Sequence, residues 1–509
     1  MPEPAIATTS ARESLWLDTA SATAYPTLSG ELDVDVAVIG GGIAGLTAAV
    51  LLNRDGARVA VLEAARVGSG VTGCTTAKVS ALQSTVYSTV RSRHGLDAAA
   101  VYAGASLAGV EQLASIAEEQ AIECALERRP AFTFALEPSE RSTVEQELEV
   151  ARSAGLDVDW AESLDLPFPV HGAVRLADQV QMQPVRYVQG LAAAVATGGS
   201  YVFEGSRALR VDHGRPCRVE TAEGTLRAGQ VVVATHYPIL DRGLYFARLK
   251  PQRSYCVAAR LATDAPSQPM AISAGTNSRS VRGFGDLQIV GGEGHPAGSF
   301  KSRAERYDKL EAFAREHWDV ASMAYRWSAH DLVPYDHLPM IGPYLPRSRR
   351  LWVSTGFMKW GLSSATFAAT IIADGIAGRA NPWAATITPN RLSLGSAHEV
   401  AQLGAKFSRD LVGDRLLPPT AVRAASVPVG EARVVLSGLG KRGVFHAEDG
   451  TLHSVSLRCS HLGCLLRFNS AERSWDCPCH GSRFGIDGGV LEGPAVKPLD
   501  YRIERPLGE

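Results

Sequence analysis

Four cysteines and two histidines lie close together near the C-terminal end of this 509-residue chain. Residues 459–464 read C-x-H-x-x-C, and residues 477–482 read C-x-C-H-G-S. Two short loops that each present a cysteine and a histidine suit an iron–sulfur cluster with two thiolates on one iron and two imidazoles on the other. Zinc also takes mixed cysteine and histidine ligands, so a structural zinc site is the competing interpretation.

The two loops resemble those of Rieske [2Fe-2S] domains, and the resemblance extends over residues 421–509. It implies a [2Fe-2S] cluster with these ligands: Cys459 and Cys477 on one iron, His461 and His480 on the other. It also implies a disulfide between Cys464 and Cys479, as in the respiratory cytochrome bc-complex subtype. A zinc site leaves Ser482 and the loop 493–495 unexplained. In Rieske domains these match the serine that bonds a cluster sulfur and the proline-containing loop over the cluster.

Phe484 departs from the pattern of high-potential Rieske domains, which usually have tyrosine at this position. The tyrosine hydroxyl donates a hydrogen bond to a cysteine sulfur. Phenylalanine has no such donor, so the electron-rich reduced cluster loses a stabilising contact. We therefore expect a reduction potential below the respiratory range.

A second set of residues suited to chemistry surrounds a glycine-rich turn near the N-terminal end. Residues 34–39 form a short β-branched run typical of a buried parallel strand, and residues 40–45 supply G-x-G-x-x-G. Residues 46–54 contain good helix formers with an apolar face, and residues 58–62 predict a second strand. A strand, a glycine turn, a helix and a strand in this order predict a dinucleotide-binding unit.

The glycines and the acidic residue of such a unit have separate roles. Gly40 permits the tight turn, Gly42 lets the backbone approach a pyrophosphate, and Gly45 allows close packing of the helix on the strand. The helix N-terminus adds free N–H groups and a partial positive charge near the phosphates. Glu63 ends the second strand and places a carboxylate where a ribose hydroxyl would bind.

Residues 63–78 resemble the flavin-contacting segment of the D-amino-acid oxidase, glycine oxidase and sarcosine oxidase superfamily. Residues 338–363 resemble a second segment, in which a strand, a turn and a helix aim the helix N-terminus at the flavin. The resemblance covers most of residues 30–384 and implies FAD as the cofactor. The residues that it places at FAD are Gly40, Gly42, Ile43, Ala44, Gly45, Glu63, Ala64, Arg66, Thr72, Cys74, Thr75, Thr76, Lys78, Thr235, Gly356, Lys359, Trp360, Gly361 and Leu362.

Three positions near the expected flavin have alternative interpretations. Lys359 is the candidate for a catalytic lysine that stabilises negative charge on the reduced flavin, with a surface lysine as the alternative. Cys74 lies where some relatives carry a flavin-linked histidine, so either a cysteinyl link or a small buried residue is expected. His236 replaces the glycine of an A-T-G strand end, and we expect a hydrogen-bonded loop residue rather than a base.

Residues that hold the substrate are poorly defined by the sequence. Arg253, Tyr255, Arg326 and Trp327 lie in segments that could face the flavin, and a structural role is expected for each of them. The expected fold combines an α/β FAD domain of the two-dinucleotide type, an α+β substrate domain and a small all-β Rieske domain. The expected FAD part comprises about 30–80, 170–245 and 330–384, the substrate part about 81–170 and 246–330, the connector 385–420 with a helix at 397–411, and the Rieske domain 421–509.

The two cofactors together indicate the reaction type. A flavin accepts two electrons as a hydride, whereas an iron–sulfur cluster carries one at a time. We expect an oxidoreductase that oxidises a small substrate and passes electrons singly through the cluster to an external acceptor. The superfamily typically oxidises C–N bonds, so an amine or amino acid is the expected substrate. The alternatives are an electron-transfer module for a partner oxygenase and a tailoring oxidase or desaturase for a natural product.

The composition excludes several other classes of protein. A count of 51 basic and 53 acidic side chains gives a net charge of -2, which argues against a nucleic-acid partner. Eight cysteines in so long a chain exclude a disulfide-stapled miniature scaffold. Neither a secretory signal nor a membrane span is expected, so a cytoplasmic location is predicted. The oligomeric state stays open.

Overall fold

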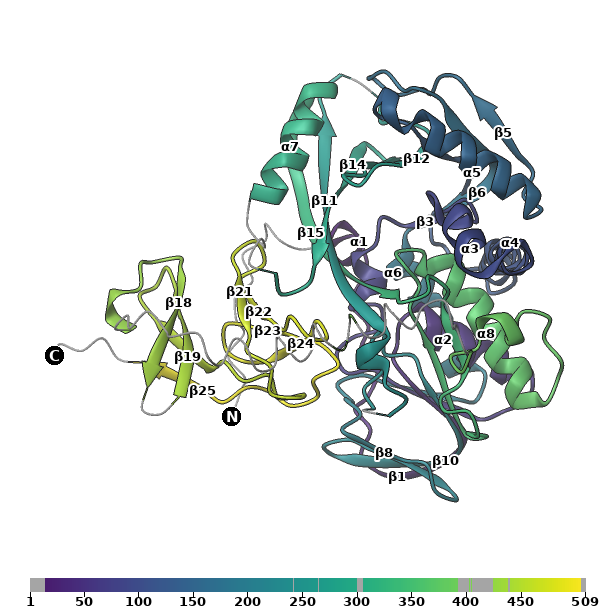
Figure 1. Cartoon of the computed structure of the whole chain (residues 1–509). Helices are drawn as coiled ribbons and strands as arrows, with labels where there is room; N and C mark the ends of the chain where they lie inside the picture. The colour runs from purple at the N-terminus through teal and green to yellow at the C-terminus, as the bar shows by residue number, and fades with distance from the viewer. Residues whose placement is uncertain are drawn as a thin grey trace.

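The computed structural model describes residues 14–240, 242–263, 265–299, 305–391, 402, 404, 424–437 and 440–504. The connector helix expected over 397–411 lies outside these residues, apart from positions 402 and 404. The described chain forms two large sheets with helices around them, and a C-terminal segment of two small sheets (residues 424–504) lies beside them (Figure 1).

The first large sheet has eight strands, with the main order β16-β17-β10-β1-β2-β7. Its strands are β1 (Gly30–Ile39), β2 (Val59–Leu62), β7 (Tyr201–Phe203), β8 (Arg210–Asp212), β9 (Cys217–Glu220), β10 (Gly224–Val233), β16 (Met340–Pro343) and β17 (Leu351–Thr355). Neighbouring strands from β7 to β17 in this order are parallel, and β16 is antiparallel to β17. Every residue of β2 and β17 is buried, as expected of parallel strands with both faces covered.

Helices rich in alanine pack closely on this sheet. Helices α2 (Ile43–Arg54), α6 (Pro184–Thr197) and α8 (Gly361–Ala377) contact it, and α2 also contacts α6 and α8. The predicted strand–turn–helix units at β1–α2 and β17–α8 are therefore confirmed. Helix α2 begins earlier than the expected residue 46, because Gly42 is its N-cap.

The second large sheet has nine strands in the order β15-β11-β14-β13-β12-β4-β6-β3, with β5 paired to β6. Its strands are β3 (Lys78–Val79), β4 (Glu127–Phe134), β5 (Val158–Ala161), β6 (Ala173–Gln181), β11 (Leu249–Leu261), β12 (Met270–Ser273), β13 (Ser280–Phe284), β14 (Leu287–Pro296) and β15 (Val320–Pro334). The remaining described helices are α1 (Leu15–Asp18), α3 (Val86–His94), α4 (Leu96–Glu119), α5 (Arg141–Ser153), α7 (Glu305–His317) and α9 (Ala384–Ile387).

Strands β3 and β6 belong to this second sheet, although the approximate limits from the sequence set them in the FAD part. Strand β6 pairs antiparallel with β3, β4 and β5, so its hydrogen bonds join it to the substrate side. Among the described residues, no helix combines the length and apolar character that a membrane crossing requires.

The C-terminal segment contains two four-stranded antiparallel sheets, as the all-β expectation required. Their strands are β18 (Ala432–Ser437), β19 (Gly440–His446), β20 (Leu452–Ser456) and β25 (Tyr501–Glu504) in one, and β21 (Arg467–Asn469), β22 (Ser474–Asp476), β23 (Arg483–Phe484) and β24 (Val490–Glu492) in the other. Trp475 and Phe484 pack in its core together with the four clustered cysteines. Strands β21–β24 lie between β18–β19 and the two large sheets (Figure 1).

Candidate active site and metal centre

A cavity of about 340 Å³ lies where the two large sheets meet the C-terminal segment. The first sheet contributes residues at the carboxyl ends of β1, β2 and β10, where open α/β sheets bind ligands. The second sheet contributes residues of β11, β14 and β15, and the C-terminal segment contributes the loop 491–496. The predicted cofactor residues in its lining are Gly40, Gly42, Ile43, Ala44, Glu63, Ala64, Thr72, Cys74, Thr75, Thr76, Lys78, Thr235, Lys359, Trp360, Gly361 and Leu362.

The structure does not bring Gly45, Arg66 or Gly356 to the cavity lining. Gly45 packs against the backbone of the glycine turn instead, because a Cβ on it would lie 2.0 Å from the Gly40 carbonyl oxygen. The predicted role in helix–strand packing fits this contact. Arg66 is exposed at the surface, and Gly356 lies against Pro334. Their contact with the cofactor stays a prediction that the cavity lining does not support.

The glycine turn fits a bound pyrophosphate. Gly40 has a φ of +115°, and a Cβ on it would lie 2.5 Å from the Ala234 carbonyl oxygen, so only glycine is accommodated. Gly42 caps helix α2 without a side chain, and Ile43 and Ala44 of the first turn line the cavity. An N-terminal helix turn that meets a cavity in this way is suited to phosphate.

Glu63 is held in place by two backbone groups. Its carboxylate accepts the Gly41 N–H at 2.8 Å and the Ala65 N–H at 2.8 Å. Burial raises the pKa of Glu63, and these bonds together with the nearby Arg207 oppose the rise. Since Glu63 and Arg207 both line the cavity, the position at the end of β2 fits the predicted ribose contact.

The turn before helix α8 is strained and faces the cavity. Met358 and Lys359 have φ values of +51° and +73°, which are unfavourable for residues other than glycine. The Lys359 N–H donates to Asp331 Oδ1 at 2.7 Å, which holds the turn in this conformation. Lys359 and the first residues of α8 line the cavity, while Lys359 is also exposed to solvent, so its role at the flavin stays a prediction beside the surface alternative.

Burial sets the protonation of three groups in the cavity. It raises the pKa of the Cys74 thiol to about 12 and lowers the pKa of Lys78 to about 7. It also lowers the pKa of His236 to about 4. Cys74 is therefore a thiol at neutral pH and a weak nucleophile, which favours the interpretation as a small residue near the flavin. His236 has a φ of +61°, the conformation that the glycine of an A-T-G strand end would supply.

Sequence reasoning missed His330, Asp331 and Glu492, which all line the cavity. Asp331 accepts a hydrogen bond at Oδ1, whereas its buried Oδ2 has no partner among the described residues. Burial raises the pKa of Asp331, and the positive charge of Lys359 opposes this shift. The only local signal is a His-Asp pair inside a long strand, and nothing in the sequence pairs that strand with residue 492.

The four residues considered for substrate contact separate in the structure. Tyr255 lines the cavity, and its hydroxyl lies 3.0 Å from His295 Nε2. Arg253 is fully buried and pairs with Glu492 of the C-terminal segment. Arg326 forms an ion pair with Glu311, whose side chain is largely buried, and Trp327 is a core residue, so both fit the structural expectation.

The predicted cluster ligands converge at one end of the C-terminal segment. The Nδ1 atoms of His461 and His480 lie 3.2 Å apart, an arrangement in which both can bind one iron. The Cys477 thiol hydrogen-bonds the Cys459 sulfur and lowers the pKa of Cys459, and Ser482 acts in the same direction. Burial lowers the pKa of His480 to about 3, so this imidazole is in the neutral form that binds metals. These features fit two sulfur and two nitrogen ligands.

The expected disulfide is present between Cys464 and Cys479, with an S–S distance of 2.02 Å. The sulfurs of Cys464, Cys477 and Cys479 lie within 4.8 Å of one another. Two of these sulfurs are bonded to each other and cannot bind a metal. Among the described residues, this observation is compatible with the predicted ligand set of Cys459, Cys477, His461 and His480.

Two family models match this chain. The model of the FAD dependent oxidoreductases matches residues 35–375, and the model of the Rieske [2Fe-2S] domain matches residues 420–502. The chain belongs to the FAD dependent oxidoreductase family. It also carries a Rieske domain at the C-terminal end, and residues 424–504 are called the Rieske domain from here on.

Similar proteins cover either the whole chain or the flavin part. The putative Rieske 2Fe-2S iron-sulfur protein YhfW of Bacillus subtilis is 32% identical over 96% of this chain and 97% of its own length. The gamma-glutamylputrescine oxidoreductase of Escherichia coli is 27% identical over 43% of this chain and 52% of its own length. The structure of glycine oxidase from Geobacillus kaustophilus has a TM-score of 0.60 and 20% identity, and covers 71% of this chain and 99% of that protein.

The family fixes the two cofactors. FAD and a [2Fe-2S] cluster belong to this oxidoreductase, and the predictions of both domains, both cofactors and the fold class are confirmed. The zinc interpretation is replaced by the cluster. Which individual residues contact FAD or ligate iron stays a prediction, which the geometry above supports.

Proposed function

We propose that this FAD dependent oxidoreductase oxidises the C–N bond of a small amine or amino acid and passes the electrons singly, through its Rieske domain, to an external acceptor. The observation that carries the proposal is the composition of the cavity, because the flavin domain and the Rieske loop 491–496 line it together. The relative named as a gamma-glutamylputrescine oxidoreductase supports an amine as the substrate.

The overall reaction balances with a one-electron acceptor. When bound, FAD supplies a hydride acceptor and the cluster a carrier of single electrons. An amine R2CH–NH2 loses two electrons and two protons and becomes an imine, which water hydrolyses to a carbonyl compound and ammonia. Two acceptor molecules each gain one electron, and the two protons go to solvent.

The residues of the chain bind and orient the amine. Asp331 Oδ2 is a buried acceptor without a partner among the described residues, so it is suited to an amine N–H. Lys359 and the N-terminus of α8 add positive charge beside the flavin position. Tyr255 and the Rieske loop line other parts of the cavity and would shield a bound amine from water there.

Anaerobic mixing of the holoenzyme with a panel of amines and amino acids tests the proposal. The expected result is loss of the flavin absorbance with at least one small amine and no added protein. If bleaching requires a partner protein in every case, the chain is an electron-transfer module instead. If only a compound without a C–N bond at the reacting carbon bleaches the flavin, the substrate class is wrong.

A further inference from the structure

The predicted cluster-binding loop packs directly against the flavin domain. The centroids of the His480 and Tyr237 rings are 5.6 Å apart. Gly481 fits so closely against His330 that a Cβ on it would lie 2.3 Å from His330 Nε2. His330 in turn lies edge-on to His236, with ring centroids 5.0 Å apart, and both of these histidines line the cavity. Packed side chains therefore connect the cavity with a predicted iron ligand.

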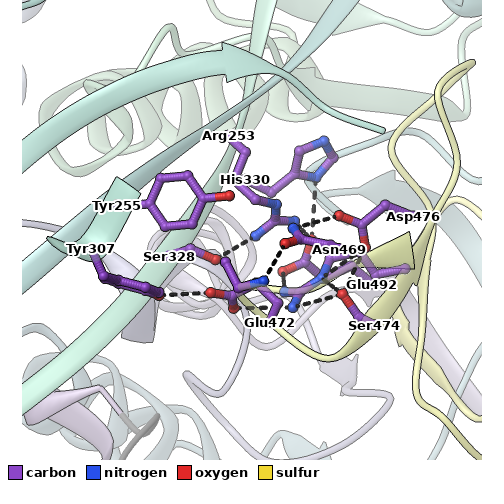
Figure 2. A network of polar contacts seen from close by, with 12 residues as sticks. Arg253, Tyr255, Tyr307, Ser328, His330, Asn469, Glu472, Ser474, Asp476 and Glu492 are labelled. Carbon is purple, nitrogen blue, oxygen red and sulfur yellow. Dashed lines mark hydrogen bonds and ion pairs between the residues drawn. The ribbon is translucent and has the colours of Figure 1, made fainter. Parts of the chain in front are cut away.

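A buried network of charges crosses the same interface (Figure 2). Arg253 on β11 donates to Ser328 Oγ at 2.8 Å and to Glu492 of the Rieske domain at 2.7 Å. Arg483, within the Rieske domain, donates to Glu492 at 2.8 Å and to Glu472 at 3.2 Å. Glu492 thus binds one guanidinium from each domain. Figure 2 shows Arg253, Ser328, Glu472 and Glu492 gathered between the long strands of the second sheet and the Rieske domain.

Further contacts surround the charge network. The Tyr307 hydroxyl on α7 donates to Glu472 at 2.6 Å, and Arg467 donates to the Gly298 carbonyl at 2.9 Å. Ala471 of the Rieske domain packs into the apolar cluster of the second sheet. Polar and apolar contacts therefore lie side by side across one interface.

The charges specify one docked position. Burial opposes ionisation of Glu492, but Arg253 and Arg483 outweigh this effect and hold its pKa below the usual range. A docked arrangement that still buried Arg253 but moved it away from Glu492 would leave its guanidinium without this carboxylate, which is strongly unfavourable. The network therefore favours this orientation of the two domains over docked orientations that would separate its charges.

We propose that the Arg253–Glu492–Arg483 network fixes the Rieske domain on the flavin domain, so that electrons pass between the two cofactor sites inside one chain. This inference rests on the electron order of the proposed function. Each transfer moves one electron from the flavin site to the cluster, where one ferric iron becomes ferrous. The second electron follows after the external acceptor has reoxidised the cluster.

Photoreduction of the flavin in the anaerobic holoenzyme tests the inference without a substrate. Light reduces the flavin with EDTA as the electron donor, and the subsequent reduction of the cluster is followed by its visible and electron paramagnetic resonance signals. The expected rate constant is independent of protein concentration. Because no amine is needed, a failure of the proposed C–N oxidation leaves this test intact.

Two variants weaken the interface. Glu492→Gln removes a charge, and Tyr307→Phe removes a hydrogen bond. Since the rate constant scales with the docked fraction, Glu492→Gln is expected to lower it about tenfold or more, and Tyr307→Phe less. Both variants should also increase protease cleavage and hydrogen exchange of β11 and β15 while the spectra of the two cofactors stay unchanged. Glu492→Asp should restore part of the rate.

Glu448→Gln is the matched control, because Glu448 forms an exposed ion pair with Arg473 within the same Rieske domain. It should behave like the wild type in rate and in protease cleavage. A wild-type rate that rises in proportion to protein concentration would overturn the inference. So would interface variants that match the Glu448→Gln control in all measurements.

Discussion

Asp331 presents two carboxylate oxygens at the cavity: Oδ1 accepts the Lys359 N–H, and Oδ2 has no hydrogen-bond partner in the part of the chain that the structure describes. The two oxygens have separate tasks in the proposed reaction: Oδ1 holds the turn at Lys359, and Oδ2 binds the amine. This separation allows the two tasks to be tested independently at a single residue.

Asp331→Asn should retain the turn but lose the acceptor. The asparagine carbonyl oxygen can still accept the Lys359 N–H, whereas the amide nitrogen replaces Oδ2 with a donor. Loss of one buried hydrogen bond of this kind costs roughly 1–3 kcal/mol, so kcat/KM for the best amine should fall about tenfold or more. Steady-state kinetics measure kcat/KM, and the FAD content of each variant serves as the control. An unchanged kcat/KM would show that Asp331 does not bind the amine.

Phe484 leads to a second prediction at the residue scale, which concerns the midpoint potential of the cluster. Phe484→Tyr adds the hydroxyl that high-potential Rieske domains carry. A gained hydrogen bond of about 1 kcal/mol in the reduced state corresponds to a rise of roughly 40 mV in midpoint potential for one electron. A redox titration followed by electron paramagnetic resonance measures it, with Phe468→Tyr as the control in the same domain. A wild-type potential already in the respiratory range would contradict the expectation.

At the scale of elements, the contact between α2 and β1 depends on the smallest possible side chain. Gly45→Ala places a methyl group 2.0 Å from the Gly40 carbonyl oxygen, so the helix must move away from the strand. Overpacking of this kind costs roughly 1–3 kcal/mol, and the displaced helix N-terminus should also weaken FAD binding. The thermal midpoint and the flavin content measure both effects.

Gly104→Ala is the matched control for that variant. Gly104 lies exposed in α4, with no neighbour closer than 4.0 Å to an added Cβ. The same substitution there should leave FAD binding intact and stabilise the helix by up to about 1 kcal/mol. Equal losses of FAD in the two variants would show that the packing argument is wrong.

The cofactor sites were predictable because their residues follow local patterns. The turn at residues 40–45 and the loops at residues 459–464 and 477–482 each place their groups within a few residues of one another. His330, Asp331 and Glu492 follow no such pattern, because they meet only when β15 and β24 dock. The connection between the two cofactor sites therefore needed the tertiary structure.

At the scale of the whole molecule, acid should weaken the docking of the two domains. Arg253 and Arg483 lower the pKa of Glu492 in the folded state, and they also lower the pKa of Glu472. Such carboxylates stabilise the docked state fully above their unfolded pKa of about 4.5. The stabilisation is lost as the pH falls from there toward the lower folded pKa. His330 and Asp476 also face this network.

Limited proteolysis between pH 3 and pH 7 measures how acid weakens the docking of the two domains. This range spans the pH at which glutamate side chains titrate. The wild type should show increasing cleavage between its domains below about pH 4.5. Glu492→Gln should be cleaved more at neutral pH and should depend less on pH, because one of the titrating groups is gone. Equal pH dependence of the two proteins would contradict the role of Glu492.

The central claim is that electrons from an amine reach the Rieske cluster of the same molecule. Rapid anaerobic mixing of the holoenzyme with its best amine, with flavin absorbance and the cluster electron paramagnetic resonance signal followed together, tests it most directly. We predict that the flavin bleaches first and that the reduced-cluster signal then appears at a rate independent of protein concentration. A cluster that stays oxidised while the flavin is reduced, together with rapid peroxide formation in air, would show a plain oxidase instead.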